Sequence, residues 1–373
     1  MMNRMPLRSI IVMVAGLALI GVPSSVLANP KAKLEVVTEV DQSPGGMTIT
    51  PNGSIILSLH QFKKTDVRVA EITPEADVRS FPTENISRGI NGTPVALDAV
   101  LGVQSDKKGI VWMLDNGRRS ESLPKLVAWD TKKDKLHRVV HLPPPATVPS
   151  SFLNDMAIDP DEPFIYITDP ADGKNAALIV VNLETGIARR VLQGHHSVIP
   201  ESIDLLIDGK KVEVRRPDGS RVKPLAGANP IAIDRKGNWL YFGPMQGRTL
   251  YRVATKHLQD EALRPTELNS RVEGYSEKPI CDGIAIDSNS NIYCSDLANK
   301  AIGVIREKDQ KYEIYIRDDR FLWPDALCFG NDGRLYFVAS QLHNTQPFNG
   351  GKDVTTRTIS IFKIKALGFG FLK

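Results

Sequence analysis

Aspartate and asparagine recur at matching places along this chain, and no other residues in it are better suited to chemistry. The acidic members of the set are Asp115, Asp155, Asp169, Asp282, Asp296 and Asp325. The amide members are Asn116, Asn154 and Asn229. Carboxylate and amide oxygens are the ligands that Ca²⁺ prefers. Carboxylates beside an aromatic ring also suit an organic ammonium group.

These residues belong to a unit that occurs six times. Each copy has an apolar strand, a turn rich in Gly, Asn or Asp, and a second apolar strand, usually with an aromatic residue. The copies lie at residues 46–59, 100–115, 155–169, 230–242, 282–296 and 325–338. A spacing of roughly 50 residues with several strands per repeat is the size of a propeller blade. The sequence therefore predicts an all-β fold, a six-bladed β-propeller with four-stranded antiparallel blades.

Segments outside the repeats complete this prediction. The alternating stretches 34–38 and 358–364 read as N- and C-terminal strands whose pairing would close the ring. The longest step between copies holds an extra hairpin at 203–215 and a further turn at 217–219, which we expect to project over one face. Residues 256–264 are the clearest candidate for a short helix.

The propeller geometry would bring the acidic residues together. In an antiparallel pair, the start of the first strand and the end of the second lie at the same rim. If the first strands are innermost, the rim surrounds one mouth of the central channel. The residues predicted to bind a ligand there are Asp115, Asn116, Arg118, Asp169, Asp296, Phe321 and Trp323. The residues predicted to hold a Ca²⁺ ion, should one bind, are Asn154, Asp155, Asn229, Asp282 and Asp325.

Two further points concern the charge and the role of this mouth. Uncompensated carboxylates repel one another, so a cation, a bound amine or Arg118 should balance them. The structural alternative is that Asp and Asn at strand ends are simply turn formers.

Asp282 and His60 are the candidate catalytic residues, since a histidine at the mouth would serve as a proton shuttle. The sequence contains no Gly-x-Ser-x-Gly, no His-Glu-x-x-His and no phosphate loop, and no organic cofactor is expected.

Composition narrows the class of partner. The 373 residues include 47 Lys and Arg against 43 Asp and Glu, a net charge of +4. No basic run occurs, so a nucleic-acid partner is not expected, whereas a small-molecule ligand is. The cysteines are Cys281, Cys294 and Cys328, and an odd number allows at most one disulfide within the chain.

The first residues read as an export signal. Residues 1–28 combine Arg4 and Arg8, an apolar run over 10–20, and small residues near Ala28. We therefore expect a secreted or periplasmic protein whose residues 29–373 form a single propeller domain, without membrane contact after cleavage. An uncleaved anchor is the alternative, although the apolar run is short for a bilayer.

Several motifs resemble the Yellow/major royal jelly protein family, in particular its bacterial members, labelled as related to dopachrome tautomerase. They are VWMLDNGR at 111–118, PKLVAWD at 124–130, SFLNDMAID at 151–159, LYFGPM at 240–245 and LWPDAL at 322–327. The resemblance extends over roughly residues 34–365 and implies a six-bladed propeller. It also implies either amine binding in the channel, dopachrome conversion, or a secreted storage or signalling role. Leu123 stands where the family commonly has a cysteine, so its disulfides are not expected here.

A more distant similarity is to gluconolactonases and paraoxonases. Asn154, Asn229 and Asp282 match the places at which those propellers hold calcium, but residues 43–46 (SPGG) stand where a glutamate is expected. Three hypotheses remain open. The protein binds an aromatic or amine-bearing ligand at the mouth, with or without dopachrome-tautomerase-like activity; or it is a calcium-dependent lactonase; or it is a non-catalytic scaffold.

Overall fold

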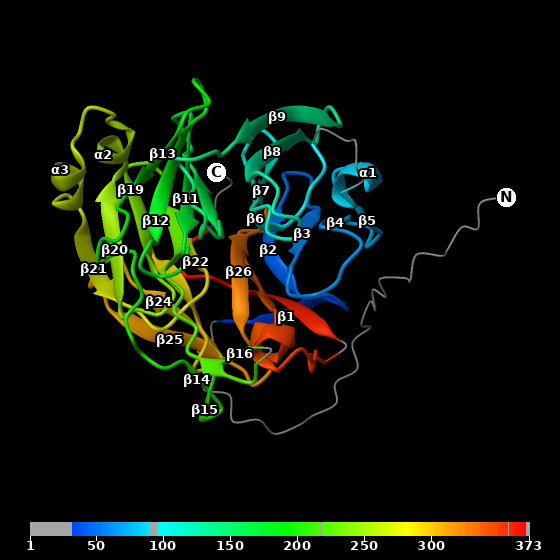
Figure 1. Ribbon diagram of the computed structural model, residues 1–373. Coiled ribbons are helices and arrows are strands. Elements are labelled where there is room, and N and C mark those ends of the chain that lie inside the picture. The colour runs from blue at the N-terminus through cyan, green and yellow to red at the C-terminus, as the bar shows by residue number, and fades with distance from the viewer. Residues whose placement is uncertain (1–31, 90–94, 217, 357, 371–373) are drawn as a thin grey trace.

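A computed structural model describes residues 32–89, 95–216, 218–356 and 358–370. It contains six four-stranded antiparallel sheets arranged around a central axis (Figure 1). The predicted six-bladed propeller is confirmed. The predicted export signal, residues 1–28, lies outside the described residues.

The blades are numbered along the chain, and their strands are given from the axis outward. Blade 1 contains β2 (Pro44–Ile49), β3 (Ile55–Leu59), β4 (Val69–Ile72) and β5 (Val78–Ser80). Blade 2 contains β6 (Val100–Ser105), β7 (Ile110–Asp115), β8 (Lys125–Asp130) and β9 (Lys135–His141). Blade 3 contains β10 (Met156–Ile158), β11 (Phe164–Asp169), β12 (Ala177–Asn182) and β13 (Ala188–Val191).

The second half of the ring repeats this arrangement. Blade 4 contains β18 (Ala228–Ile233), β19 (Trp239–Pro244), β20 (Thr249–Ala254) and β21 (Glu273–Glu277). Blade 5 contains β22 (Ile284–Ile286), β23 (Ile292–Asp296), β24 (Ala301–Ile305) and β25 (Tyr312–Arg317). Blade 6 contains β26 (Pro324–Phe329), β27 (Leu335–Ala339), β28 (Ile359–Ile364) and β1 (Leu34–Val40).

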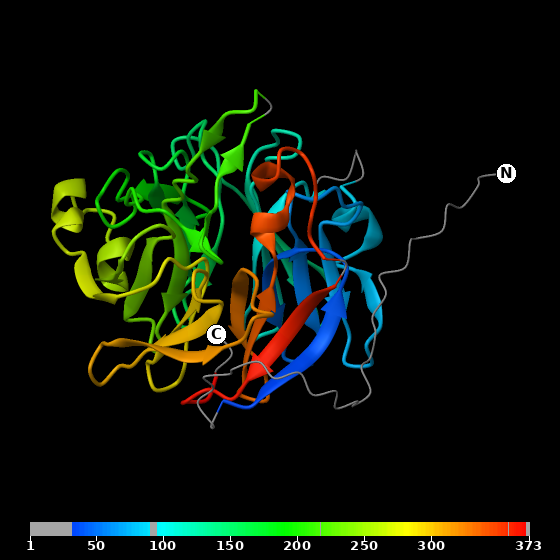
Figure 2. The ribbon, with the colours of Figure 1, turned by 90° about the horizontal axis from the view of Figure 1, so that it is seen from below.

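The first and last strands of the described chain meet in blade 6. There β1 pairs antiparallel with β28, so that Leu34 lies opposite Ile364 and Val40 opposite Ile359. Figure 2 shows the blue first strand beside the red last one. This arrangement confirms the predicted closure. The first described strand, β1, is thus the outermost strand of the last blade, and its hydrogen bonds to β28 hold the ring closed.

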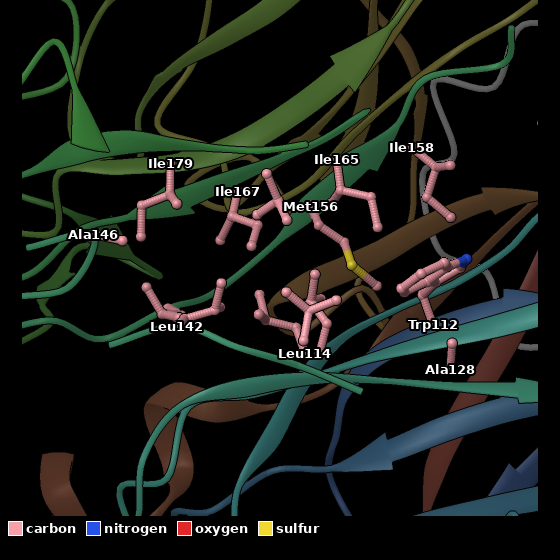
Figure 3. Packing of buried hydrophobic residues seen from close by; sticks show 14 of the residues in the cluster. Trp112, Leu114, Ala128, Leu142, Ala146, Met156, Ile158, Ile165, Ile167 and Ile179 are labelled. Atoms are coloured by element: carbon pink, nitrogen blue, oxygen red, sulfur yellow. The ribbon is translucent and has the colours of Figure 1, made fainter. Parts of the chain in front are cut away.

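Apolar clusters fill the spaces between neighbouring blades. Figure 3 shows the cluster between blades 2 and 3, where Leu114 and Trp112 face Ile167 and Met156. Five further clusters join the other neighbouring pairs, including the pair formed by blades 6 and 1. Inner strands such as β10 are buried along their whole length. They read as continuous apolar runs because both of their faces pack against other blades.

The long step after blade 3 forms two small hairpins, as the sequence predicts. The first pairs β14 (Leu206–Ile207) with β15 (Lys210–Lys211), and the second pairs β16 (Val214–Arg215) with β17 (Arg221–Val222). Near the predicted helix at 256–264 there are two shorter ones, α2 (Thr255–Gln259) and α3 (Pro265–Asn269). The chain is extended at Asp260, and Pro265 begins a new helix because its ring suits the first turn.

The remaining helices are short and lie in loops. They are α1 (Glu84–Ser87) and the 3₁₀ turns η1 (Leu342–Asn344) and η2 (Gln346–Phe348). Within the described part of the chain, no helix is long and apolar enough to cross a membrane.

Candidate functional site

A narrow channel runs along the propeller axis and has a volume of about 90 Å³. The inner strands of blades 1, 2, 3, 4, 5 and 6 contribute to its wall. Its polar mouth is lined by all five residues that the sequence predicts as metal ligands: Asn154, Asp155, Asn229, Asp282 and Asp325. The first strands are therefore innermost, and their starts do converge on one mouth.

Hydrogen bonds join the mouth residues of four consecutive blades into an arc. The side-chain amide of Asn154 donates to Oδ1 of Asn229, whose own amide donates to Oδ1 of Asp282. The indole Nε1–H of Trp323 donates to Oδ2 of Asp282 at 2.6 Å. Both oxygens of Asp282 thus accept a hydrogen bond, one from each side. Blade 1 contributes no polar side chain at its start, because Gly45 and Gly46 line the wall there.

Two carboxylates at the mouth are electrostatically unusual. Asp282 and Asp325 are only 7% and 8% exposed. Burial raises the pKa of Asp282, although hydrogen bonds from Trp323 and Asn229 act in the opposite direction. Burial raises the pKa of Asp325 well above its usual range, and repulsion from Asp282 and Asp155 adds to this effect. No lysine or arginine is among the groups responsible for either shift.

Trp323 joins the acidic mouth to an aromatic group above it. Its ring stacks on His343 with 5.9 Å between centroids and lies 6.0 Å from Phe348. Phe348 lies 6.1 Å from Phe62, which in turn lies 4.2 Å from His60. These rings come from blades 1 and 6, on the side of the mouth that lacks amide residues. Burial lowers the pKa of His343 to about 4, and its Nδ1 has no hydrogen-bond partner among the described residues.

An apolar roof covers this end of the channel. Leu205, Ile207 and Val212 of the insertion pack against Trp323 and Leu342. Met245, Ile280 and Leu297, from loops of blades 4 and 5, complete the same cluster. Figure 2 shows the green hairpins of the insertion and the orange 3₁₀ turns at the same end of the molecule, and β16 contacts η2. The insertion therefore projects over the mouth face, as the sequence predicts.

An ion pair holds the tip of the first hairpin in place. The Lys300 ammonium lies 2.6 Å from Asp208, which is in the turn between β14 and β15. On the other side of the mouth, Lys63 lies 3.4 Å from Asp353, in the loop that carries η1 and η2. The roof thus rests on apolar contacts and is held at its edges by two ion pairs.

His60, one of the two predicted catalytic residues, is buried at the edge of the mouth. Its Nδ1 accepts a hydrogen bond of 3.1 Å from the backbone N–H of Phe62. Burial lowers its pKa to about 3, and the charge of Arg119 contributes in the same direction. Its ring would lie 3.3 Å from a Cβ atom at Gly45, which lines the channel. His60 is therefore a neutral histidine directly behind the blade 1 wall.

Three of the predicted ligand-binding aspartates do not line the channel. Asp115, Asp169 and Asp296 end the second strands of their blades and are fully buried. Asp115 accepts backbone N–H groups from residues 98, 99 and 117 and pairs with Lys125 at 2.8 Å. Asp169 accepts from Phe152 and pairs with Arg190 at 2.7 Å. These carboxylates fix the loop that leads into the inner strand, which corrects the expectation of a six-aspartate mouth.

The rest of the predicted ligand-binding set is also engaged elsewhere. Asp296 accepts the Tyr312 hydroxyl at 2.5 Å and the amide of Asn299. Asn116 donates to Gln61 at 3.0 Å and so joins two blades. Arg118 donates to the carbonyls of Ser151 and Pro149, so it does not balance the mouth as expected. Phe321 packs in the core between blades 5 and 6. Of this set, only Trp323 bonds to a residue that lines the mouth.

The fit to calcium can be judged from the donors and their bonds. Three carboxylates and two amide carbonyls are the right chemistry for Ca²⁺. In this arrangement, however, Asn229 and both oxygens of Asp282 bond to neighbouring side chains rather than pointing at a common centre. No group of three or more His, Cys, Asp and Glu side chains in the described ranges is placed to hold a metal ion. The residues present therefore do not fit a calcium ion as they stand.

Sequence reasoning predicted that the insertion projects over one face, but it did not predict the packing of the insertion on Trp323 or the positions of Phe62 and Phe348, because loops make these contacts. The signal in the sequence that could have predicted these contacts is the place of the two long loops between the strands they connect. The insertion joins an outer strand to the next inner strand, and residues 340–358 join β27 to β28. Both connections end at the mouth face, so their apolar residues had to cover it.

Comparisons with known proteins agree with this architecture. The family model described as major royal jelly protein matches residues 99–364. A search among curated protein sequences found no match. A luciferin-regenerating enzyme superimposes with a TM-score of 0.59 at 10% identity, over 92% of this chain and 99% of the other. A gluconolactonase from Xanthomonas campestris gives 0.52 at 12%, over 93% and 98%. The calcium-binding protein regucalcin from Agrobacterium tumefaciens gives 0.53 at 12%, over 89% and 94%.

Proposed function

Since this chain belongs to the major royal jelly protein family, we propose that it binds a small organic cation, an amine that carries an aromatic ring, at the mouth of its central channel. The observation that supports this proposal is the set of carboxylates that line the mouth, Asp155, Asp282 and Asp325, of which Asp282 and Asp325 are buried and repel each other. A cationic ligand would relieve the mutual repulsion of these carboxylates.

The surroundings favour an aromatic amine over a bare ammonium ion. The channel itself, at about 90 Å³, has room for little more than a charged head group. The rest of the ligand would have to lie between the channel and the roof, against Trp323 and near Phe348 and Phe62. An indole face attracts cations and also stacks on other rings. The site therefore suits an arylalkylamine whose charged end enters the channel.

Isothermal titration calorimetry with dopamine and serotonin tests the proposal. We expect binding that weakens with added salt, because the attraction is largely electrostatic. The matched control ligand is 3,4-dihydroxyphenylacetate, which keeps the catechol ring of dopamine but replaces the ammonium by a carboxylate, and it should not bind. If the acid bound as well as the amine, or if no amine produced heat, the proposal would be wrong.

A tautomerase-like activity would use the same pocket. His60 and His343 are neutral at physiological pH because burial lowers the pKa of each. Without a ligand, burial and repulsion favour the protonated form of Asp325, whereas a bound ammonium group would favour its charged form. A neutral base and a protonated acid near one ligand are the pair that proton transfer between two carbon or oxygen positions requires. Conversion of dopachrome, followed by its loss of visible absorbance, is the assay for this finer proposal.

A calcium-dependent lactonase is a second candidate, and the all-oxygen donor set of the mouth is the observation in its favour. It would require the Asn154–Asn229–Asp282 arc to open, because these side chains bond to one another. Calorimetry with CaCl₂ and hydrolysis of a simple lactone with and without a chelator separate the two candidates. Calcium binding with chelator-sensitive turnover would favour the lactonase, and amine binding unaffected by chelator would favour the amine site.

We also propose that the protein acts outside the cytoplasm. The support for this is the character of residues 1–28, a basic start followed by an apolar run and small residues. Fractionation of expressing cells and N-terminal sequencing of the product test it. A chain that begins near residue 29 in the periplasm or medium is expected, whereas a full-length cytoplasmic chain would contradict it.

A further inference from the structure

The carboxylates at the mouth differ in how their oxygens are used. Asp282 accepts one hydrogen bond on each oxygen, from the Asn229 amide and from the Trp323 indole. These two donors come from blades 4 and 6, so Asp282 links three blades. A carboxylate held in this way is fixed in orientation. Its negative charge is already partly stabilised by the two donors, so it attracts a cationic ligand less strongly.

Asp325 is in a different position. Burial raises its pKa, and the carboxylates of Asp282 and Asp155 raise it further by repulsion. The backbone N–H of Ala326 acts in the opposite direction. A Cβ atom at Gly283 would lie 3.0 Å from its Oδ1, so the glycine leaves the space that this carboxylate occupies. Asp325 is therefore a channel-lining acid with little to stabilise its charge.

The backbone that carries Asp325 is strained. Trp323 and Ala326 have φ angles of +58° and +53°, in the left-handed region that favours glycine. A register shift interrupts the pairing of β26 with β27 between Asp325 and Cys328. None of Asn154, Asp155, Asn229 and Asp282 has a positive φ. Such conformations are costly for residues other than glycine, and they persist where the surrounding structure holds a side chain in a required direction. Bulges likewise re-aim side chains next to active sites.

From these observations we infer that Asp325, and not Asp282, is the carboxylate that contacts the cationic group of the ligand, and that Asp282 is a positioning residue. Asp282 holds the Trp323 ring and the Asn229 amide in place, while the strained segment 323–326 directs Asp325 into the channel. This inference rests on the proposed amine site and assigns its contacts. It also differs from the expectation from the sequence, in which Asp282 was one of two candidate catalytic residues and both acids were candidate metal ligands.

The first test compares matched substitutions by calorimetry with dopamine. Asp325→Asn should weaken binding at least about 30-fold, since it removes the charge that the ammonium contacts. Asp282→Asn should weaken it by only about 3- to 5-fold, through a less firmly held Trp323. Asp309→Asn, a substitution of the same type at an exposed turn, is the control and should have no effect. Equal losses at 325 and 282, or a larger loss at 282, would overturn the inference.

A second test needs no ligand, and so separates failure of this inference from failure of the amine proposal. If Asp325 is a buried acid kept for binding rather than for stability, Asp325→Asn should raise the Tm at pH 7 by about 2 °C, because the amide removes the repulsion from Asp282 and Asp155. Asp282→Asn should lower it by a similar amount, because it weakens the bonds to Trp323 and Asn229. A Tm that falls for Asp325→Asn, or rises for Asp282→Asn, would contradict the assignment even if dopamine binds. If dopamine fails to bind but both Tm shifts appear, the amine proposal alone is wrong.

Discussion

Aspartate serves two distinct purposes in this ring, and the position of each residue in its blade decides which. At the start of an inner strand, Asp282 and Asp325 face the channel. At the end of the next strand, Asp115 and Asp169 face the loop that enters the blade and bind its backbone N–H groups. The two positions are close in sequence pattern but differ by one strand in distance from the axis. The repeat in the sequence therefore identified the aspartates, but it could not distinguish those that line the channel from those that bind the backbone.

The buried ion pair of Asp115 provides a test of this structural role. Asp115→Asn should lower the free energy of unfolding by about 3–5 kcal/mol, because it leaves the buried Lys125 ammonium without its carboxylate. Urea unfolding followed by far-UV circular dichroism measures the loss. The folded variant should still bind dopamine, and Asp309→Asn serves as the exposed control. Loss of binding without loss of stability would show that Asp115 contacts the ligand after all.

The buried histidines predict a loss of stability in acid. The pKa of His60 is about 3 and that of His343 about 4, against ordinary values near 6.5. Both residues bind protons more readily when the chain is unfolded, so they stabilise the native state above pH 6.5 and this contribution falls as the pH drops toward 4. Urea unfolding at pH 7, 6 and 5 should show a steady decrease that is smaller for His60→Gln. The exposed His141→Gln should behave like the parent protein, and an unchanged slope in His60→Gln would contradict the assignment.

Among the strands, β1 has the largest effect relative to its length. It is the outermost strand of blade 6, yet it comes from the other end of the described chain. Its pairing with β28 is what converts six sheets in a row into a closed ring. The rest of blade 6 is continuous in sequence, so β1 adds a strand-to-strand closure to the apolar packing between blades 6 and 1.

Removal of β1 should therefore weaken the whole protein. Deletion of residues 32–41 leaves β28 with an unpaired edge and uncovers part of the cluster between blades 6 and 1. We expect an earlier urea midpoint and aggregation visible by size-exclusion chromatography. The point substitution Val36→Thr, at a site that is 41% exposed, should change little. A deletion variant as stable and monomeric as the parent protein would show that β1 is dispensable.

The insertion after blade 3 is the other element with a role beyond its own size. Its apolar residues rest on Trp323, and its tip is held by the Lys300–Asp208 ion pair. If the ligand enters from this face, it has to pass the roof to reach the mouth. The turn residues in the sequence predicted the hairpins. Their packing on Trp323 could be seen only in the folded structure, because Trp323 belongs to a distant part of the chain.

Shortening the roof should change the kinetics of binding. Replacement of residues 204–212 by a short Gly-Ser linker removes the apolar cover, so dopamine should associate and dissociate faster. Stopped-flow fluorescence measures both rates. Asp208→Asn, which weakens only the ion pair at the tip, should give a smaller change of the same sign. An unchanged association rate in the linker variant would show that the ligand does not enter past the roof.

The molecule as a whole is stabilised by six separate apolar clusters rather than by one central core. The axis is a channel, and the buried apolar surface lies between neighbouring blades. Each blade contributes to two clusters. Lost packing between two blades should therefore destabilise both of them. This arrangement leaves the axis free for polar side chains, and it explains how acidic residues are accommodated at the centre of the protein.

Two truncations at different junctions test this organisation. Ile167→Ala, between blades 2 and 3, and Phe337→Ala, between blades 5 and 6, should each cost about 2–5 kcal/mol. Because they lie in separate clusters, their effects should add in the double variant. Urea unfolding followed by both circular dichroism and tryptophan fluorescence should give a single transition. Two transitions, or strong non-additivity, would show that the halves of the ring unfold separately.

The repeat in the sequence was enough to determine the number of blades and the inner position of the first strands, and the alternating stretches 34–38 and 358–364 predicted the pairing that closes the ring. These features follow from apolar periodicity and turn residues, which are local. The five residues Asn154, Asp155, Asn229, Asp282 and Asp325 followed from the same reasoning, because the start of an inner strand has one place in a propeller. What only the tertiary structure decided was the use of each polar group. Whether a carboxylate meets a lysine, an indole or another carboxylate depends on neighbours that the closed ring brings from distant blades, and no local pattern records them.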